Sequence, residues 1–223
     1  SGKKTWFFFT ADYAFGHTLE RDTTEVVLAS GGKVLGGVKH PINTTDFSSF
    51  MAQAQSSKAE VIGLANAGGD TIGSVKQAAE LGIMGSKQTV VPLLMFTSDI
   101  QALGLRQTAG MTFTEGWYWD FNDANRKFAE RFMKEFKGKA PTSVQAGVYS
   151  ATMQYLKAVE ATKTDNSDAV MKQMKSIEIN DGLFKGRIRA DGKFEHDMYL
   201  LEVKKPNESK GPNDVAKVVK VIA

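Results

Sequence analysis

The sequence predicts an α/β protein whose first half is a Rossmann-like lobe of parallel βαβ units. An apolar run over residues 4–10 leads into a small polar loop and an amphipathic pattern, which is typical of a strand buried on both faces of a sheet. Such runs recur at intervals of roughly 28 residues with a helical pattern between each pair, the spacing of right-handed crossovers. After Gly110 the pattern changes to consecutive helices, which indicates a second, different part.

Start and stop signals delimit the elements of the first half. Gly31 and Gly32 end the first helix as a C-terminal cap would, and residues 44–46 offer N-caps for the second helix. Gly82 closes the third helix. The predicted strands cover residues 4–10, 34–38, 61–65 and 90–96, and the predicted helices cover residues 17–30, 47–56 and 71–81.

The helices predicted in the second half have no strand between them. Ahead of them, an extended piece over residues 111–114 runs into three neighbouring aromatic residues, Trp117, Tyr118 and Trp119. The three predicted helices cover residues 124–136, 143–162 and 167–175. Their apolar faces must cover something, yet the sequence supplies no second parallel sheet for them.

The C-terminal part is predicted to be antiparallel. Asp191 and Gly192 are a strong hairpin signal, and we expect the hairpin to join residues 186–189 with residues 198–203. A stretch rich in Pro, Asn, Ser and Gly follows, and residues 215–222 form a last apolar strand.

The composition is that of a globular protein and excludes several classes of function. Hydrophobic residues make up 42% and charged residues 24%, and a net charge of +3 is too small to indicate nucleic acid as a partner. No apolar run approaches the roughly 18 residues that span a membrane. The absence of cysteine removes disulfides, thiol catalysis and cysteine-ligated metal.

Signatures of enzymes and of cofactor sites are missing from the sequence. No glycine-rich dinucleotide or phosphate loop follows a strand, and there is no nucleophile elbow. His17, His40 and His196 have no carboxylate at metal-ligand spacing and are interpreted as structural or surface residues. We therefore expect no catalytic residue, no metal and no cofactor.

Three strand-end loops hold the candidate ligand-binding residues. The carboxyl ends of parallel strands meet at one edge of a sheet, where ligands of open α/β folds bind. The first loop offers a carboxylate and two rings, the second exposes backbone N–H groups at a helix start, and the third brings short polar groups. The candidates are Asp12, Tyr13 and Phe15, then Ala67, Gly68 and Asp70, and finally Thr97, Ser98 and Asp99.

Each candidate also has a purely structural interpretation. Tyr13 or Phe15 would serve equally as a lid over the core, and Asp70 as the cap of a glycine turn. Trp117 suits an aromatic ligand beside a cleft, but an aromatic stripe is more often part of a core. The position of all three loops on one rim of one sheet is a stronger signal than any single residue.

Several motifs together resemble the Leu/Ile/Val-binding type of periplasmic solute-binding protein. Their order and spacing agree across nearly the whole sequence. They are residues 3–16, the Asp46-Phe47-Ser48 segment before the second helix, Lys76 to Gly82, and Tyr149-Ser150-Ala151. The resemblance implies a two-lobed flytrap of the type I periplasmic-binding-protein fold, which captures a small molecule and delivers it to the permease and ATPase subunits of an ABC importer.

The resemblance also implies roles for individual positions. It puts Phe15 where such binders have a ligand-contacting tyrosine, and Ala67 and Gly68 where they have an aromatic pair. Ser98 lies where they place an acid that holds the ammonium group of the substrate, unless Asp99 replaces that acid. Because this sequence departs at these positions, we expect an aromatic or other organic acid rather than a branched-chain amino acid.

The same resemblance accounts for the missing second sheet. We expect residues 1–115 to form the ligand-binding lobe, residues 116–182 to be helices of the other, incomplete lobe, and residues 183–223 to return to the first lobe. A signal peptide and an N-terminal lobe would precede the sequence in a periplasmic protein. Helices without their sheet would leave an apolar face, from which we expect self-association.

Two other functions remain open at this point. The sequence is also compatible with the ligand-sensing domain of a receptor or regulator, and with an α/β enzyme that acts on a small acid with Asp12 or Asp99 as base.

Overall fold

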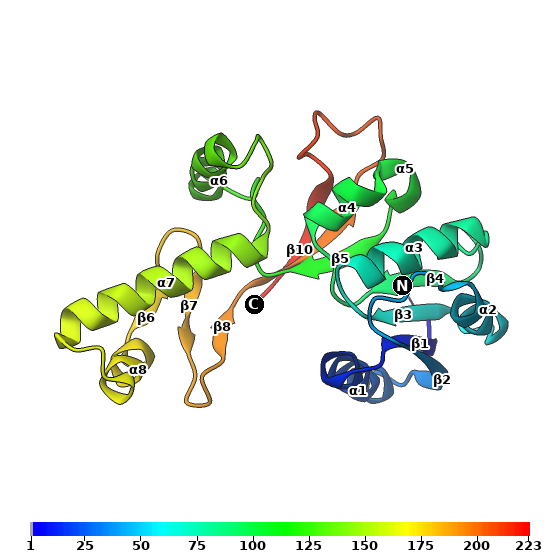
Figure 1. Ribbon diagram of the computed structural model, residues 1–223, viewed down its shortest axis with the longest axis horizontal. Coiled ribbons are helices and arrows are strands. Elements are labelled where there is room, and N and C mark those ends of the chain that lie inside the picture. The colour runs from blue at the N-terminus through cyan, green and yellow to red at the C-terminus, as the bar shows by residue number, and fades with distance from the viewer. Residues whose placement is uncertain (1) are drawn as a thin grey trace. The chain divides into compact units, whose positions relative to one another are not determined.

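The computed structural model describes residues 2–223, which divide into two compact units (Figure 1). Unit 1 contains the chain up to Thr114 together with Glu202–Lys217, and unit 2 contains Glu115–Leu201 together with Val218–Ala223. The boundaries fall inside three strands, β5 (Thr112–Glu115), β9 (Met198–Val203) and β10 (Ala216–Ile222), which form a three-stranded sheet in the order β10-β9-β5.

Unit 1 is built around a parallel sheet, as the sequence predicts. The strand order is β2-β1-β3-β4, and every pairing is parallel. β1 lies between β2 and β3, so both of its edges are hydrogen-bonded. The strands are β1 (Thr5–Ala11), β2 (Lys33–His40), β3 (Val61–Ala65) and β4 (Thr89–Pro92).

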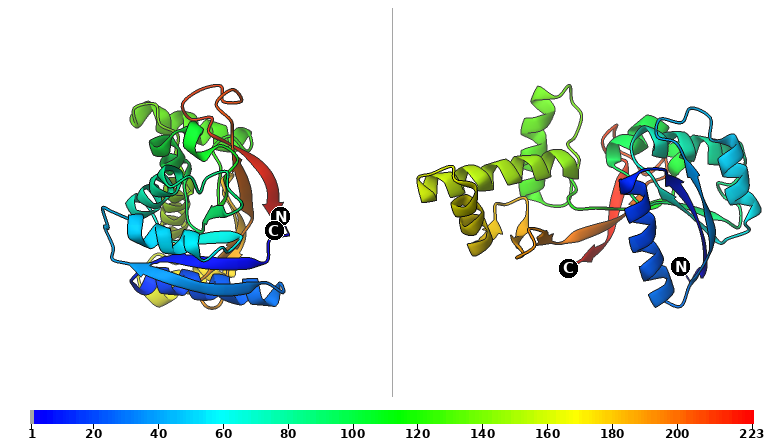
Figure 2. Two further views of the ribbon diagram at one scale, coloured as in Figure 1. Left: turned by 90° about the vertical axis from the view of Figure 1, so that its right-hand side faces the viewer. Right: turned by 60° about the horizontal axis from the view of Figure 1, so that its bottom comes forward.

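Alternating residues of β1 face two different helix layers. Thr10 donates a hydrogen bond to Glu20 of α1 (Ala14–Ala29), with 2.7 Å between the two oxygens. The ring of Phe9 points the opposite way and packs against Phe47 and Phe50 of the α2 region (Ser48–Ser56), with centroids 5.8 and 6.4 Å apart. Figure 2 shows α1 on one side of the sheet, with α2 and α3 (Gly69–Glu80) on the other. The sheet is therefore covered on both faces, which explains its continuous apolar runs.

The last strand of this sheet is shorter than predicted. The sequence predicts a strand over residues 90–96, but β4 ends at Pro92. Its neighbour β3 ends at Ala65, so a longer strand would have no partner to pair with. The chain turns instead into two short helices that the sequence analysis missed, α4 (Thr97–Leu103) and α5 (Leu105–Thr108).

Unit 2 consists of three helices and a small antiparallel sheet. Its core cluster contains Trp117, Ala129, Ala146 and Phe184, with Phe128 and Phe194 packed against it. No parallel sheet is present among the described residues of this unit. Its elements are α6 (Asp123–Glu135), α7 (Ser143–Thr162), α8 (Ser167–Ser176), β6 (Glu178–Asn180), β7 (Lys185–Ile188) and β8 (Phe194–His196), with the strands in the order β6-β7-β8.

The predicted hairpin turn is confirmed, but the predicted partner strand is wrong. Arg189 and Lys193 close the turn around Gly192, whose φ of 90° suits glycine. The strand opposite β7 is β8, not residues 198–203, because a tight turn pairs the residues nearest to it. Residues 198–203 form β9 and pair in the other antiparallel sheet.

A half-buried carboxylate fastens α7 to the turn between β6 and β7. Asp181 accepts hydrogen bonds from the Ser150 hydroxyl and, at 2.8 Å, from the backbone N–H of Phe184. Burial is the largest influence on this carboxyl and opposes its ionisation. The hydrogen bonds from Ser150, Phe184, Leu183 and Gln154 together outweigh burial and hold the pKa of Asp181 below its usual value.

The helices carry no membrane-span signal. Across residues 2–223, none of them combines the length and the apolar character needed to cross a bilayer.

Candidate ligand-binding site

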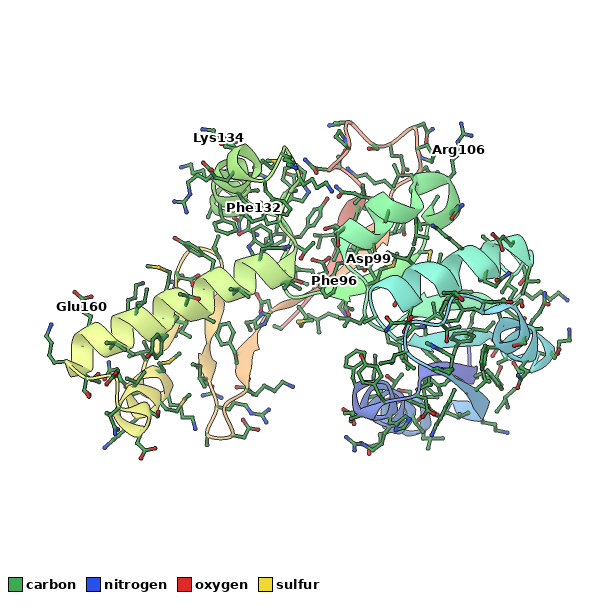
Figure 3. The ribbon with its side chains drawn as sticks, viewed as in Figure 1. Phe96, Asp99, Arg106, Phe132, Lys134 and Glu160 are labelled. Atoms are coloured by element: carbon green, nitrogen blue, oxygen red, sulfur yellow. The ribbon has the colours of Figure 1, made fainter. Side chains whose placement is uncertain are left out.

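The three predicted loops follow neighbouring strands of the unit 1 sheet. Asp12 follows β1, Asn66 follows β3, and the segment that ends at Phe96 follows β4. Since these parallel strands lie in the order β1-β3-β4, their carboxyl ends share one edge. Each loop then leads into a helix, so the N-terminal ends of α1, α3 and α4 follow that edge, and Figure 3 shows Phe96 and Asp99 at the start of α4.

Gly16 allows the first of these helices to lie directly on the strand ends. A Cβ atom at this position would lie 2.1 Å from the carbonyl oxygen of Ala11 and 3.0 Å from that of Ala65. Those two carbonyls belong to the last residues of β1 and β3. Only a residue without a side chain fits between them, so Gly16 sets how close the first two loops come.

A buried polar network holds the second loop in place. Nδ1 of His40 donates to the carbonyl of Pro41 at 2.9 Å, which leaves Nε2 to accept from the Asn66 amide at 3.1 Å. The same amide donates to Ser74 at 3.0 Å, and its oxygen accepts from Thr71 at 2.9 Å. His40, Asn66, Thr71 and Ser74 are all fully buried. The network is fully satisfied and therefore fixes the start of α3.

The second loop ends in a helix start that no side chain caps. Gly68 has φ 57° and ψ −126°, a conformation open mainly to glycine. Gly69 and Asp70 begin α3, and no side chain of the described residues accepts from its first-turn N–H groups. Such a helix start attracts anions, because its N–H groups and the helix dipole both favour negative charge.

The first loop presents a carboxylate and two aromatic rings. Asp12 accepts a hydrogen bond from Nε2 of His17 at 2.7 Å, so part of the predicted acceptor is already engaged. The rings of Tyr13 and Phe15 lie side by side with centroids 5.7 Å apart. Tyr13 is 43% exposed, and this surface is available to a flat ligand. Like α3, α1 opens without a side-chain cap.

The third loop is only partly exposed. Ser98 is exposed, while Thr97 and Asp99 are buried. The Asp99 carboxylate accepts from the backbone N–H of Phe96 at 2.9 Å, inside the fold. Burial raises the pKa of Asp99, and the hydrogen bond from Phe96 opposes that rise. Asp99 therefore serves the start of α4 and leaves Ser98 as the polar group of this loop that faces solvent.

Trp117 belongs to unit 2, whereas the other candidates belong to unit 1. Its side chain has no exposed surface and packs edge-to-face against Phe128, with centroids 5.7 Å apart. Its indole Nε1 is buried without a hydrogen-bond partner among the described residues. This placement favours the core interpretation of Trp117 over ligand contact.

The described residues of the predicted rim form no metal-ligand cluster, and they do not line the two cavities of unit 2. Within residues 2–223, no group of three or more His, Asp or Glu side chains is placed to hold a metal ion. Two cavities of about 1230 and 240 Å³ lie in unit 2, along the β7–β8 hairpin and the loop before α6. None of the ten predicted residues lines either cavity.

Sequence reasoning missed the residues that hold the rim loops in position. Gly16, His40, Asn66, Thr71 and Ser74 were not among the predicted site residues. For Asn66 a signal existed, because a polar amide directly after a fully apolar strand needs buried partners. The partners themselves come from β2 and α3 and are visible only in the fold.

Comparisons with known proteins identify the family. The family model of the periplasmic binding proteins matches residues 1–212. The crystal structure of a periplasmic binding protein from Burkholderia mallei is 54% identical with a TM-score of 0.96, over 99% of this chain and 58% of that chain. A branched-chain amino acid ABC transporter periplasmic ligand-binding protein from Burkholderia xenovorans is 37% identical with a TM-score of 0.86, over 100% of this chain and 59% of that one.

A curated relative gives the same result. The Leu/Ile/Val-binding protein homolog 6 of Brucella melitensis is 28% identical over 216 residues, which cover 93% of this chain and 55% of that protein. The chain thus spans somewhat more than half the length of the proteins it matches. With a family model that covers most of its residues, the chain belongs to the periplasmic binding protein family.

Proposed function

We propose that the chain is part of the substrate-binding component of an ABC importer and captures a small organic ligand at the strand-end rim of unit 1. The observation that carries this proposal is the convergence of three strand-end loops on one edge of the β1-β3-β4 sheet, two of them opening uncapped helices. Unit 2 would belong to the opposite lobe. Membership of the family supports this assignment.

The proposed binding mode follows from the chemistry of the rim. A ligand carboxylate would accept from the first-turn N–H groups of Gly69 and Asp70, where the positive end of the α3 dipole lies. The rings of Tyr13 and Phe15 would contact the apolar or aromatic body of the ligand. The Ser98 hydroxyl would add one neutral hydrogen bond.

The ligand class we favour is an aromatic or other organic acid rather than a branched-chain amino acid. An α-ammonium group needs a free carboxylate, but Asp99 is buried and bonded to Phe96, and Asp12 is paired with His17. A solute-binding protein from Rhodopseudomonas palustris, crystallised in complex with 4-hydroxybenzoate, has the same fold at 21% identity and a TM-score of 0.85. This fold therefore accommodates aromatic acids.

A branched-chain amino acid is the second candidate ligand. The names of two relatives favour it, since one is a Leu/Ile/Val-binding protein homolog and the other a branched-chain amino acid transporter component. Asp12 would then have to release His17 to hold the ammonium group.

The remaining parts of the proposal follow from the family. The protein would act in the periplasm, close on its ligand by a hinge motion and dock with permease and ATPase subunits. It would have no catalytic activity, so conversion of any bound compound would contradict the proposal.

Titration calorimetry with 4-hydroxybenzoate and with leucine tests the proposal. We expect heat of binding with the aromatic acid and much weaker binding of leucine. Tyr13→Ala should weaken aromatic-acid binding by about tenfold, because an aromatic contact contributes roughly 1 kcal/mol beyond its buried area. Tyr155→Ala is the matched control, since Tyr155 lies in unit 2 and is 44% exposed against 43% for Tyr13. Equal losses in both variants would place the ligand elsewhere.

A further inference from the structure

The strand order of unit 1 creates a crevice between the ends of β1 and β3. From β1 the chain crosses to β2 on one side, whereas from β3 it crosses to β4 on the other side, so the direction of winding reverses between these two strands. The helices of the two crossovers therefore lie on opposite faces of the sheet, as Figure 2 shows for α1 and α3. Ligands of open α/β sheets bind where the winding reverses.

His17 lies on the β1 side of this crevice, in the first turns of α1. Its backbone N–H donates to the carbonyl of Tyr13 at 3.1 Å, so His17 lies one turn after that residue. Helix side chains lean toward the N-terminal end, and the His17 ring accordingly meets Asp12, with 2.7 Å between Nε2 and a carboxylate oxygen. Asp12 directly follows β1, and its own N–H donates to the carbonyl of His40 at the end of β2. The ring is thereby anchored to the strand ends.

The contact with Asp12 decides how the imidazole of His17 can bond to a ligand. An ionised carboxylate only accepts hydrogen bonds, so Nε2 carries the hydrogen that Asp12 accepts. In the neutral ring Nδ1 then holds a lone pair and is an acceptor. Among residues 2–223 no group bonds to Nδ1, and the His17 side chain is 43% exposed. His17 therefore offers an acceptor to a ligand, and the carboxylate behind the ring strengthens that acceptor by polarising it.

The two sides of the crevice are chemically opposite. On the α3 side the uncapped N–H groups of Gly69 and Asp70 can only donate, whereas on the α1 side Nδ1 of His17 accepts. The rings of Tyr13 and Phe15, with centroids 5.7 Å apart, add a flat apolar surface on the α1 side. This arrangement is complementary to a ligand with a carboxylate at one end, a hydroxyl group at the other and an apolar body between them.

We propose that His17 is a specificity-determining residue that accepts a hydrogen bond from a hydroxyl group of the ligand, and that the ligands of this site are hydroxylated organic acids. Asp12 is then the positioning residue that holds the ring. This inference rests on the proposed function, since it requires that an organic acid binds at the rim. A site that bonds a hydroxyl group discriminates against the analogue that lacks it, because the acceptor then stays unpaired.

Titration calorimetry with 4-hydroxybenzoate and with benzoate measures the contribution of the hydroxyl group. The parent chain should bind 4-hydroxybenzoate about tenfold more tightly than benzoate, as expected for one hydrogen bond. His17→Phe keeps a flat ring without the acceptor, so both acids should bind this variant equally. His17→Gln, whose amide oxygen still accepts, should retain part of the preference.

Arg21→Gln is the matched control. Arg21 pairs with Asp22 at 2.8 Å, so this variant also removes an exposed polar contact of α1, one turn further along the helix than His17. It should leave the preference for 4-hydroxybenzoate unchanged. Asp12→Ala should lower the preference, because the ring loses the partner that holds it.

The outcomes separate this inference from the proposed function. If both acids bind the parent chain equally, the proposed function stands and the role of His17 is overturned. A preference that persists in His17→Phe and disappears in Asp12→Ala would overturn it too, because the hydroxyl group would then bond to Asp12. The same holds if benzene-1,4-dicarboxylate binds more tightly than 4-hydroxybenzoate, which would show a protonated ring that donates to a second anion. If neither benzoate nor 4-hydroxybenzoate binds, the proposed ligand class and this inference fail together.

Discussion

The two units use the same kind of amphipathic helix in opposite ways. In unit 1 the helices cover both faces of a parallel sheet, and apolar side chains such as Phe8, Phe9 and Val75 have no exposed surface. In unit 2 the long helix α7 buries its small and polar side and exposes Val144 and Val148. The difference shows that an amphipathic pattern determines the helix, while the neighbouring layer decides which face is buried.

The first prediction probes the closest packing in unit 1. Gly16→Ala should cost about 3 kcal/mol of unfolding free energy or more, because the new Cβ would meet the Ala11 carbonyl at 2.1 Å. Gly147→Ala in α7 of unit 2 meets nothing within 4 Å and should instead stabilise the helix by roughly 0.5–1 kcal/mol. Urea denaturation of both variants measures the contrast. If the two substitutions changed the free energy of unfolding by the same amount, for example if both were neutral, the predicted contrast would be disproved.

The second prediction removes the buried network below the rim. Asn66→Leu should destabilise the protein by roughly 2–3 kcal/mol, because His40, Thr71 and Ser74 lose their buried partner. The loss is measured from the midpoint of urea unfolding. Thr71→Val, which removes one hydrogen bond, should cost less than half as much. If both cost the same, the network would not act through Asn66.

The third prediction compares the same substitution in the two units. Val75→Ala should cost roughly 2 kcal/mol, since Val75 has no exposed surface and its loss leaves a cavity. Val148→Ala should change stability by less than about 0.5 kcal/mol at concentrations where the chain is monomeric. Thermal unfolding of dilute samples gives both values. A large loss at Val148 would mean that α7 is covered within the chain.

The fourth prediction concerns pH and the carboxylate of unit 2. Asp181→Asn should cost about 1 kcal/mol at pH 7, where Asp181 is ionised and accepts its hydrogen bonds. Since folding lowers the pKa of Asp181, its contribution is complete above the unfolded pKa near 4 and is lost as the pH falls through the folded value. The difference between the variant and the parent protein should therefore shrink below about pH 4.

The sequence predicted the main helices of both units and the parallel strands of unit 1 well. Strand β3 and helix α7 have the predicted bounds, and the remaining main helices differ by a few residues at their ends. Strong periodicity and glycine stops carry this information locally. The family resemblance stated from residues 3–16 and from the later motifs is confirmed by the family model.

Details that depend on residues distant in the sequence could not be predicted from the sequence. The hairpin partner was wrong because residues 198–203 form the longer apolar run, whereas the tight turn pairs β7 with the nearer residues 194–196. Whether Asp99 is free or engaged depends on the Phe96 amide, and whether Trp117 is exposed depends on Phe128. The ligand roles of the rim residues remain predictions.

Amide chemical-shift mapping of the ¹⁵N-labelled chain with 4-hydroxybenzoate tests the central claim most directly. The account predicts that the largest shifts fall on Tyr13, Phe15, Gly69, Asp70 and Ser98, all in unit 1. The amides of Val144, Val148 and Tyr155 in unit 2 should not move. Saturable shifts confined to unit 2, or no saturable shift with any organic acid or amino acid, would contradict the assignment of the ligand site to the strand-end rim.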